Sequence, residues 1–260
     1  MDYWQKIEKN PYDDLYWNIP EQRRGSINVI GGNSGQFRTS VKVAEFLVRA
    51  YPIKEVRTVL PDVLASKLPP VEGLVFLTST ESGSFADADE LITTFREAEW
   101  NLLVGDLSKN SITERAVREA VARAARPVVV TRDTVDMLAT PGVDMTLMNE
   151  NLILMGSMVQ ITKIFRAAYY PKMLTLSAPI TQIIEALHKF TLSYPTKLIT
   201  LHNGQVLVAA DGKVASVGIE ATGYSPFMLW SGECAAKIVA LNLYNPGKFV
   251  EATVAGLLAK

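Results

Sequence analysis

Short apolar runs alternate with amphipathic segments along most of this chain, and that alternation restricts the folds open to it. Runs such as 26–32 and 73–80 have the length and apolar composition of buried strands. The segments between them, such as 40–51 and 113–125, carry apolar residues at helical spacing. Strands separated by helices form a mostly parallel sheet with helices on both faces. The sequence therefore predicts an α/β fold.

The last third of the chain carries a second pattern, which is typical of hairpins. Residues 196–219 form three alternating apolar runs, separated by Asn203-Gly204 and Asp211-Gly212. Asn-Gly and Asp-Gly favour two-residue turns in which both residues have positive φ. A late antiparallel hairpin is therefore expected beside the parallel strands. Other strands are expected at 56–61, 101–108, 127–131 and 151–158, and other helices at 88–97, 159–168, 178–193 and after 233.

The chain is expected to form one domain behind an N-terminal arm. Its 260 residues are 48% hydrophobic, enough for one large core, and no linker or internal repeat divides them. Residues 1–25 are expected to form an irregular arm rich in aromatic and charged residues, and 26–260 the domain. The arm is too apolar to remain in solvent, so it is expected to cover a sheet edge or a neighbouring subunit, and a homo-oligomer is predicted. Its aromatic residues are Tyr3, Trp4, Tyr12, Tyr16 and Trp17.

Composition argues against several classes of partner. The net charge of -1 offers no basic field for nucleic acid or an anionic membrane. Two histidines make a His-rich metal site implausible, and one cysteine allows no internal disulfide. Neither a signal peptide nor a run long enough to cross a bilayer is visible. A cytoplasmic location is therefore expected, with no nucleic-acid or membrane partner and no protein-bound metal.

Candidate site residues follow the predicted strands. In sheets of this kind, ligands bind beyond the carboxyl ends of the strands. Each of these segments alone is more simply a structural turn, but together they predict a ligand site at one edge. The segments are Gly31-Gly32-Asn33-Ser34-Gly35, Gly105-Asp106, Thr131-Arg132-Asp133, Met155-Gly156-Ser157, His202-Asn203-Gly204 and Ser231-Gly232-Glu233.

The last of these segments has two interpretations. A Ser-Gly-Glu turn at a helix start directs backbone N–H groups and a positive dipole end at an anion, and Glu233 would supply a base beside it. Alternatively, Ser231 is an ordinary N-cap and Glu233 only complements the helix dipole.

Other reactive residue types also have structural interpretations. His202 is expected to be an exposed neighbour of its turn rather than a proton shuttle. Cys234 is expected to be a small core residue rather than a nucleophile. Four methionines around one strand are expected to fill gaps in the core, namely Met145, Met148, Met155 and Met158.

The order of segments over 26–258 resembles the ribokinase-like superfamily, and in particular the ADP- or ATP-dependent NAD(P)H-hydrate dehydratases. The resemblance is carried by GGNSG at 31–35, PVVVTRDTVDML at 127–138, LILMGSMVQITKI at 152–164, TLHNGQVLVAADGKV at 200–214 and TGYSPFMLWSGECAAKIVALNL at 222–243. It implies a three-layer sandwich with a mostly parallel central sheet and a late β-hairpin.

The resemblance also implies a function and roles for residues. Hydrated NADH or NADPH would be the substrate, with ADP or ATP as cofactor, with or without Mg²⁺. Glu233 would be the catalytic base. Nucleotide or phosphate binding falls on Ser231, Gly232, His202, Asn203 and Gly204. Substrate binding falls on Gly31, Gly32, Asn33, Asp106, Asp133 and Ser157.

The chain departs from the resembled family where the chemistry lies. The helix-start aspartate is Glu233, and the His-Pro-Gly-Glu motif is replaced by Ser157–Gln160. A lysine position on the nucleotide side is Leu201. Three functions therefore remain open: a weakened or inactive dehydratase, a catalytically silent binding or structural protein, and a small-molecule kinase. Residues that could replace the lost groups are Arg132, Lys163 and His202. Other departures are Arg38, Thr131 and Trp230.

Overall fold

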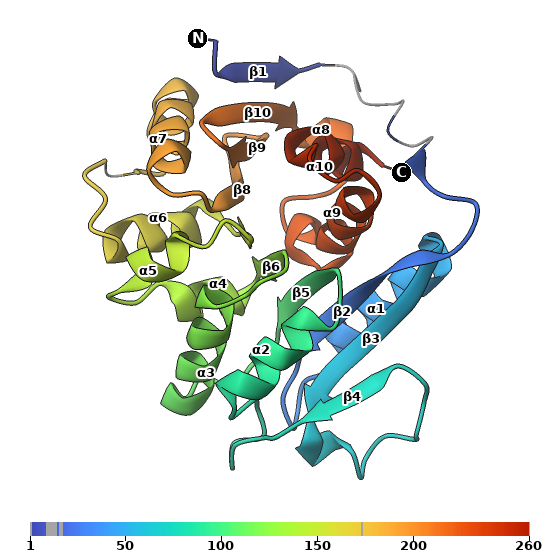
Figure 1. Cartoon of the computed structure of the whole chain (residues 1–260). Helices are drawn as coiled ribbons and strands as arrows, with labels where there is room; N and C mark the ends of the chain where they lie inside the picture. The colour runs from blue at the N-terminus through green and yellow to red at the C-terminus, as the bar shows by residue number, and fades with distance from the viewer. Residues whose placement is uncertain (1, 9–14, 16–17, 173, 260) are drawn as a thin grey trace.

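One ten-stranded sheet runs through the computed structural model, which describes residues 2–8, 15, 18–172 and 174–259. Its strand order is β1-β10-β9-β8-β7-β6-β5-β2-β3-β4 (Figure 1). Among the described strands only β9 runs antiparallel to the others. The strands are β1 Trp4–Ile7, β2 Arg24–Gly31, β3 Ile53–Pro61, β4 Leu74–Leu77, β5 Trp100–Gly105, β6 Val128–Thr131, β7 Leu152–Met155, β8 Lys197–His202, β9 Gln205–Ala210 and β10 Lys213–Gly218.

Helices cover both faces of this sheet (Figure 1). One face packs against α1 Arg38–Ala50, α9 Glu233–Tyr244 and α10 Phe249–Leu258. The other packs against α2 Ala88–Arg96, α3 Ser111–Ala122, α4 Asp133–Leu138, α5 Val143–Leu147, α6 Met158–Ala167 and α7 Ile180–Ser193. Short helical turns complete the elements, namely η2 Asp62–Leu64, α8 Ile219–Thr222 and η3 Met228–Trp230.

The strands are apolar on both sides because both sides are covered. In β5, Leu102 and Val104 face the layer of α1 and α9, whereas Leu103 faces the opposite core. All three are almost fully buried. Such continuous apolar runs are the pattern of a doubly covered parallel sheet. The predicted α/β sandwich with a late hairpin is confirmed.

Both predicted tight turns have the expected backbone. Asn203 and Gly204 have φ of +47° and +72°, and Asp211 and Gly212 have +49° and +73°. Two successive residues with positive φ match the right-handed twist of the flanking strands. The turns therefore join β8 to β9 and β9 to β10, as predicted.

The N-terminal arm was expected to be irregular, but part of it is a strand. β1 pairs in parallel with β10 at the sheet edge. The Tyr3 ring stacks on His188 at 3.8 Å between centroids, and Trp4 Nε1 donates to Ser216 Oγ at 2.9 Å. These two aromatic residues thus cover an edge of their own sheet. Self-association of the chain stays a prediction, since Tyr12, Tyr16 and Trp17 lie outside the described residues.

The structure contradicts one local expectation and moves the start of one predicted helix by two residues. Met145 and Met148 lie exposed on α5 and do not fill the core, although Met155 and Met158 are buried. Helix α3 begins before Thr113, because the side chain of Asn110 accepts hydrogen bonds from the Ile112 and Thr113 amides and acts as the N-cap. Among the helices described, none is long and apolar enough to cross a membrane.

Candidate functional site

The predicted site segments lie at one edge of the sheet. Strands β2, β5, β6, β7 and β8 run in the same direction, so their carboxyl ends meet there (Figure 1). The first residue of α9 follows Gly232, whose position against α1 brings the helix start to the same edge. The structure thus brings the segments together, and the roles of their residues stay proposals.

An ion pair lies between the ends of β5 and β6. Arg132 Nη2 donates to Asp106 Oδ1 at 2.7 Å, and Nη1 donates to Thr39 Oγ1 of α1 at 3.1 Å. Asp106 and Arg132 have φ of +59° and +58°, which is uncommon for residues other than glycine. Each such residue costs on the order of 1–3 kcal/mol and persists only where its surroundings hold it.

Side chains from the first turns of α4 and α6 hold both backbone conformations. Asp133 accepts the Asp106 amide at 3.0 Å and the Leu107 amide at 3.2 Å. Gln160 Nε2 donates to the carbonyl of Arg132 at 2.6 Å. The strained loop ends are therefore fixed by hydrogen bonds from outside their own strands, as is typical of functional sites.

Asn33 connects this pair to the loop after β2. Its Nδ2 donates to the Asp106 carbonyl at 2.7 Å, and its Oδ1 accepts the amides of Gly35 and Gln36 at 2.9 and 3.0 Å. Three predicted substrate residues, Asn33, Asp106 and Asp133, thus form one hydrogen-bonded network. Their side chains are largely occupied within the protein.

Ser157 joins the same network through a helix cap. Its side chain accepts the Gln160 amide, and the Ser157 amide donates to Gln160 Oε1 at 3.0 Å. This is a capping box at the start of α6. The segment that replaces His-Pro-Gly-Glu therefore supports α6 and the backbone of Arg132.

The start of α9 corrects one expectation. Its N-cap is Gly232, with φ of +93°, while Ser231 ends the preceding turn and makes no cap. A Cβ on Gly232 would lie 2.8 Å from Val43 Cγ2 and 3.7 Å from Thr39 Cγ2. Only glycine fits here, because α9 begins directly against the first turns of α1.

These two helix starts have no side-chain caps. Neither Phe37, the N-cap of α1, nor Gly232 forms a cap hydrogen bond within the described part of the chain. The first amide N–H groups of each helix therefore lack an intrahelical partner and carry the positive end of its dipole. Two such starts in contact form a suitable position for an anion.

Glu233 lies at the α9 start but does not join the network. Its carboxylate is 49% exposed and lies 3.8 Å from Lys237 Nζ, one turn along the helix. Lys237 also donates to the Ala259 carbonyl at 3.1 Å and lies 5.2 Å from the centre of the Tyr224 ring. Among the described residues, neither a hydrogen bond nor an ion pair links Glu233 to Arg132. The carboxylate proposed as the base therefore lies beside Lys237 and is not bonded to the described residues at the strand ends.

His202 is not the exposed turn residue that its sequence context predicted. It is 4% exposed, and its Nε2 lies 2.8 Å from the Ala178 carbonyl in the segment before α7. The adjoining Gly204 carbonyl accepts the Ile219 amide. A hydrogen bond that fixes the imidazole explains its burial, and a nucleotide-binding role for 202–204 remains a proposal.

Cys234 is fully buried in the first turn of α9, as the core interpretation predicted. Burial raises the pKa of its thiol from 9.0 to about 12, despite the nearby cation of Lys237. The native thiol should therefore contain about 1,000-fold less thiolate at pH 8 than an unfolded one.

We expect native protein to resist alkylation by iodoacetamide at pH 8, whereas protein in denaturing urea should react readily. Because the folded state binds this proton more tightly, the stability it confers is complete below pH 9 and is lost as pH rises toward 12. Rapid alkylation of the native thiol would contradict this assignment.

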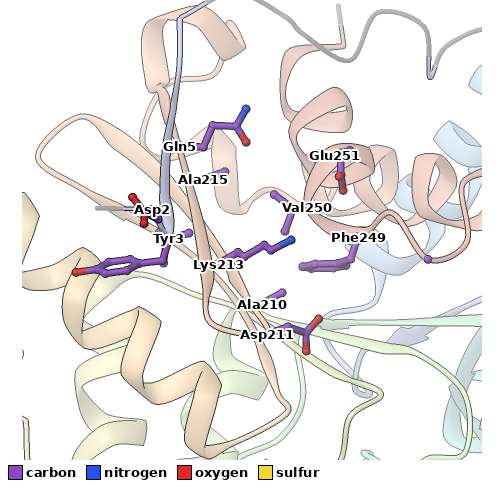
Figure 2. Close-up of a pocket in the computed structure, with 12 residues that line it drawn as sticks. Asp2, Tyr3, Gln5, Ala210, Asp211, Lys213, Ala215, Phe249, Val250 and Glu251 are labelled. Carbon is purple, nitrogen blue, oxygen red and sulfur yellow. The ribbon is translucent and has the colours of Figure 1, made fainter.

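A different pocket opens at the opposite edge of the sheet, near the amino end of β10 and the start of α10 (Figure 2). Its volume is about 400 Å³, and Lys213 extends across it toward Phe249. The residues that line it include none of the predicted site residues. The predicted site is therefore separate from this pocket.

Comparison with known proteins identifies the fold. No protein-family model and no curated protein matches the chain. A ribokinase-like superfamily protein of Enterococcus faecalis is 10% identical, with a TM-score of 0.66 over 99% of this chain and 86% of the other. A hypothetical protein of Streptococcus mutans is 14% identical, with a TM-score of 0.65 over 97% and 87%.

A kinase also shares the architecture. Adenosine kinase of Anopheles gambiae, solved with a di-adenosine tetraphosphate, is 10% identical, with a TM-score of 0.52 over 98% of this chain and 90% of the other. The chain therefore has the ribokinase-like fold that its segment order predicted. At these identities the likeness is one of fold, and function must be argued from the site.

Proposed function

We propose that this protein binds a nucleotide phosphate at the paired starts of α1 and α9 and transfers a phosphoryl group to a small molecule. The observation that carries the proposal is the contact of Gly232 with α1, which joins two uncapped helix starts. Amide N–H groups that are already oriented stabilise charge on a transferring phosphoryl group without reorganisation.

Hydrated NADH or NADPH is the substrate that the sequence resemblance supports. Its hydroxyl oxygen would attack the terminal phosphoryl group of ADP or ATP, AMP or ADP would leave, and Glu233 would take the hydroxyl proton. Loss of phosphate from the product, together with a proton from the neighbouring ring carbon, would then restore the dihydronicotinamide ring. A small-molecule kinase would perform only the first step, and the kinase that shares this fold supports that alternative.

One group of residues would bind the nucleotide and its transferring phosphoryl group, and a second group would bind the substrate. Ser231, Gly232 and the first amides of α9 would hold the transferring phosphoryl group. The turn at 202–204 would contact the nucleotide from the end of β8. Asn33, Asp106 and Asp133 would shape the substrate side, with Asp133 acting as a positioning residue because its oxygens already accept two amides.

A divalent metal ion would be held by the nucleotide phosphates and not by a set of protein ligands. Within the described residues, no group of three His, Cys, Asp or Glu side chains could hold a metal ion. Asp106 pairs with Arg132, and Glu233 lies beside Lys237. Mg²⁺ would therefore arrive on the phosphates, as it commonly does.

The pairing of Glu233 with Lys237 favours a second candidate, a binding protein without catalysis. A base must lie within hydrogen-bond reach of the proton it removes. In this structure the carboxylate faces a cation instead. Catalysis therefore requires Glu233 to leave Lys237, whereas ligand binding does not.

A ligand panel tests binding, and a coupled assay tests catalysis. ATP, ADP, AMP, NADH and NADPH, each with and without Mg²⁺, should include a ligand that stabilises the fold by about 2.7 kcal/mol at 100 times its Kd. Incubation with NADH hydrate and ADP or ATP should restore NADH absorbance. The variant Lys213→Ala, altered at the opposite edge, should behave like the parent. A panel without any stabilising ligand would overturn the proposal.

A further inference from the structure

The Arg132–Asp106 pair lies beside the proposed phosphate position. We propose that Arg132 is the cation that binds the ligand phosphate and that Asp106 is its exchangeable counter-ion. On binding, the guanidinium turns from Asp106 to the phosphate, and the freed carboxylate accepts a hydroxyl of the same ligand. The ligand class is a phosphate ester or nucleotide that carries a hydroxyl near the phosphate. This inference rests on the proposed function.

The position of the guanidinium supports this role. Arg132 Nη1 donates to Thr39 Oγ1, and Thr39 Cγ2 lies 3.7 Å from where a Cβ of Gly232 would be. The Thr39 side chain therefore contacts the guanidinium through its hydroxyl and lies beside Gly232, the N-cap of α9, through its methyl group. Arginine binds phosphate with two parallel hydrogen bonds. From its position Arg132 could make these bonds to the same phosphate that the two helix starts would bind.

The guanidinium has unused capacity. Arginine has five N–H donors, and the hydrogen bonds of Arg132 to described residues use two of them. The side chain is 30% exposed, whereas that of its partner Asp106 is 12% exposed. Arg132 can thus bind a ligand that arrives from solvent, while the less exposed Asp106 stays beside it.

The backbone holds Arg132 in one orientation. Its φ of +58° and ψ of -138° are maintained by the hydrogen bond from Gln160, which is itself held by the α6 cap. Because the main chain is fixed, only the side chain needs to move. A binding group of this kind loses less entropy when the ligand arrives.

Two residues next in the chain to Arg132 and Thr39 carry buried hydroxyls that lack a polar partner among the described residues. Thr131 directly precedes Arg132, and Ser40 directly follows Thr39. Both are fully buried, and in the described structure neither hydroxyl has a hydrogen-bond partner. Buried polar groups normally have one. A polar ligand, or water that accompanies it, would satisfy them.

Binding of two probes tests the exchange. Inorganic pyrophosphate supplies phosphate without a hydroxyl-bearing sugar, and ADP supplies both. By isothermal titration, Arg132→Gln should weaken both probes by about 10- to 100-fold, as expected for lost charge-assisted hydrogen bonds. Arg132→Lys should recover part of the loss. Asp106→Asn should strengthen pyrophosphate binding several-fold, since no ion pair must break. The same variant should strengthen ADP binding less, because it also loses the carboxylate that would accept a hydroxyl of ADP.

The control is Arg49→Gln, which removes the same charge from the exposed end of α1 and should change either affinity by less than about twofold. Circular dichroism and the urea midpoint identify variants that fail to fold, and Arg132→Lys keeps the charge if Arg132→Gln does not fold. Equal affinity of Arg132→Gln and the parent protein would overturn this inference and leave the proposed function standing. Failure of the parent to bind either probe would overturn this inference, and a ligand panel without any stabilising ligand would overturn the proposed function as well.

Discussion

Gly105→Ala is expected to lower the free energy of unfolding by about 2.5–5 kcal/mol. Gly105 has φ of +83°, and a Cβ there would overlap Asp133 Oδ1. The left-handed conformation costs a residue with a side chain about 1–2 kcal/mol. Displacing Asp133 also breaks its bonds to the Asp106 and Leu107 amides, at about 1.5–3 kcal/mol for hydrogen bonds to a charged group.

Urea denaturation measures this effect, and Gly142→Ala is the matched control. Gly142 has φ of +86°, and a Cβ there would meet no atom of the described structure within 4 Å. Its substitution should therefore cost only the backbone term, about 1–2 kcal/mol. Equal losses in the two variants would show that Asp133 moves aside freely and does not hold the strained loop.

Glu233→Gln is expected to reduce turnover by about 100-fold or more if the protein transfers phosphoryl groups. The substitution keeps the shape of the side chain but removes the base at the α9 start. Stability should change by no more than about 1 kcal/mol, because the carboxylate is half exposed and only complements the helix dipole and Lys237. Turnover is measured as NADH recovered from its hydrate, and stability by urea denaturation.

The control for this variant is Glu251→Gln, which removes a carboxylate from the first turn of α10 at the opposite edge. It should leave turnover unchanged. Glu233→Asp restores the residue of the resembled family and shortens the reach to Lys237, so it should raise turnover if the site is only detuned. Unchanged turnover in Glu233→Gln would assign catalysis elsewhere. An inactive parent that Glu233→Asp does not rescue would favour the binding protein.

Local sequence rules were sufficient for most of the alternation of strands and helices after residue 25 and for the edge at which the candidate segments lie. The alternation of apolar runs and amphipathic helices implies a doubly covered parallel sheet, whatever the detailed packing. Asn203-Gly204 and Asp211-Gly212 specify their turns because both residues of each must adopt positive φ. Parallel strands then bring their carboxyl ends together, which explains why the scattered segments meet.

Contacts between residues far apart in the sequence determined the features that local rules did not predict. The position of β1 depends on partners such as Ser216, 212 residues from Trp4. The burial of His202 depends on the Ala178 carbonyl, and the choice of Gly232 over Ser231 as N-cap accompanies its close packing on Val43.

The Arg132–Asp106 pair also combines a feature that the local sequence determines with features that only distant contacts decide. The sequence by itself determined that each of these residues follows a strand, since local periodicity shows where strands lie along the chain, whereas the pairing of β5 with β6 is a tertiary contact. Only the tertiary structure decided that both adopt positive φ and that their side chains meet, because Asp133 and Gln160 hold the two backbones from other segments. No local pattern encodes the free energy of such a network, which depends on groups that folding brings together.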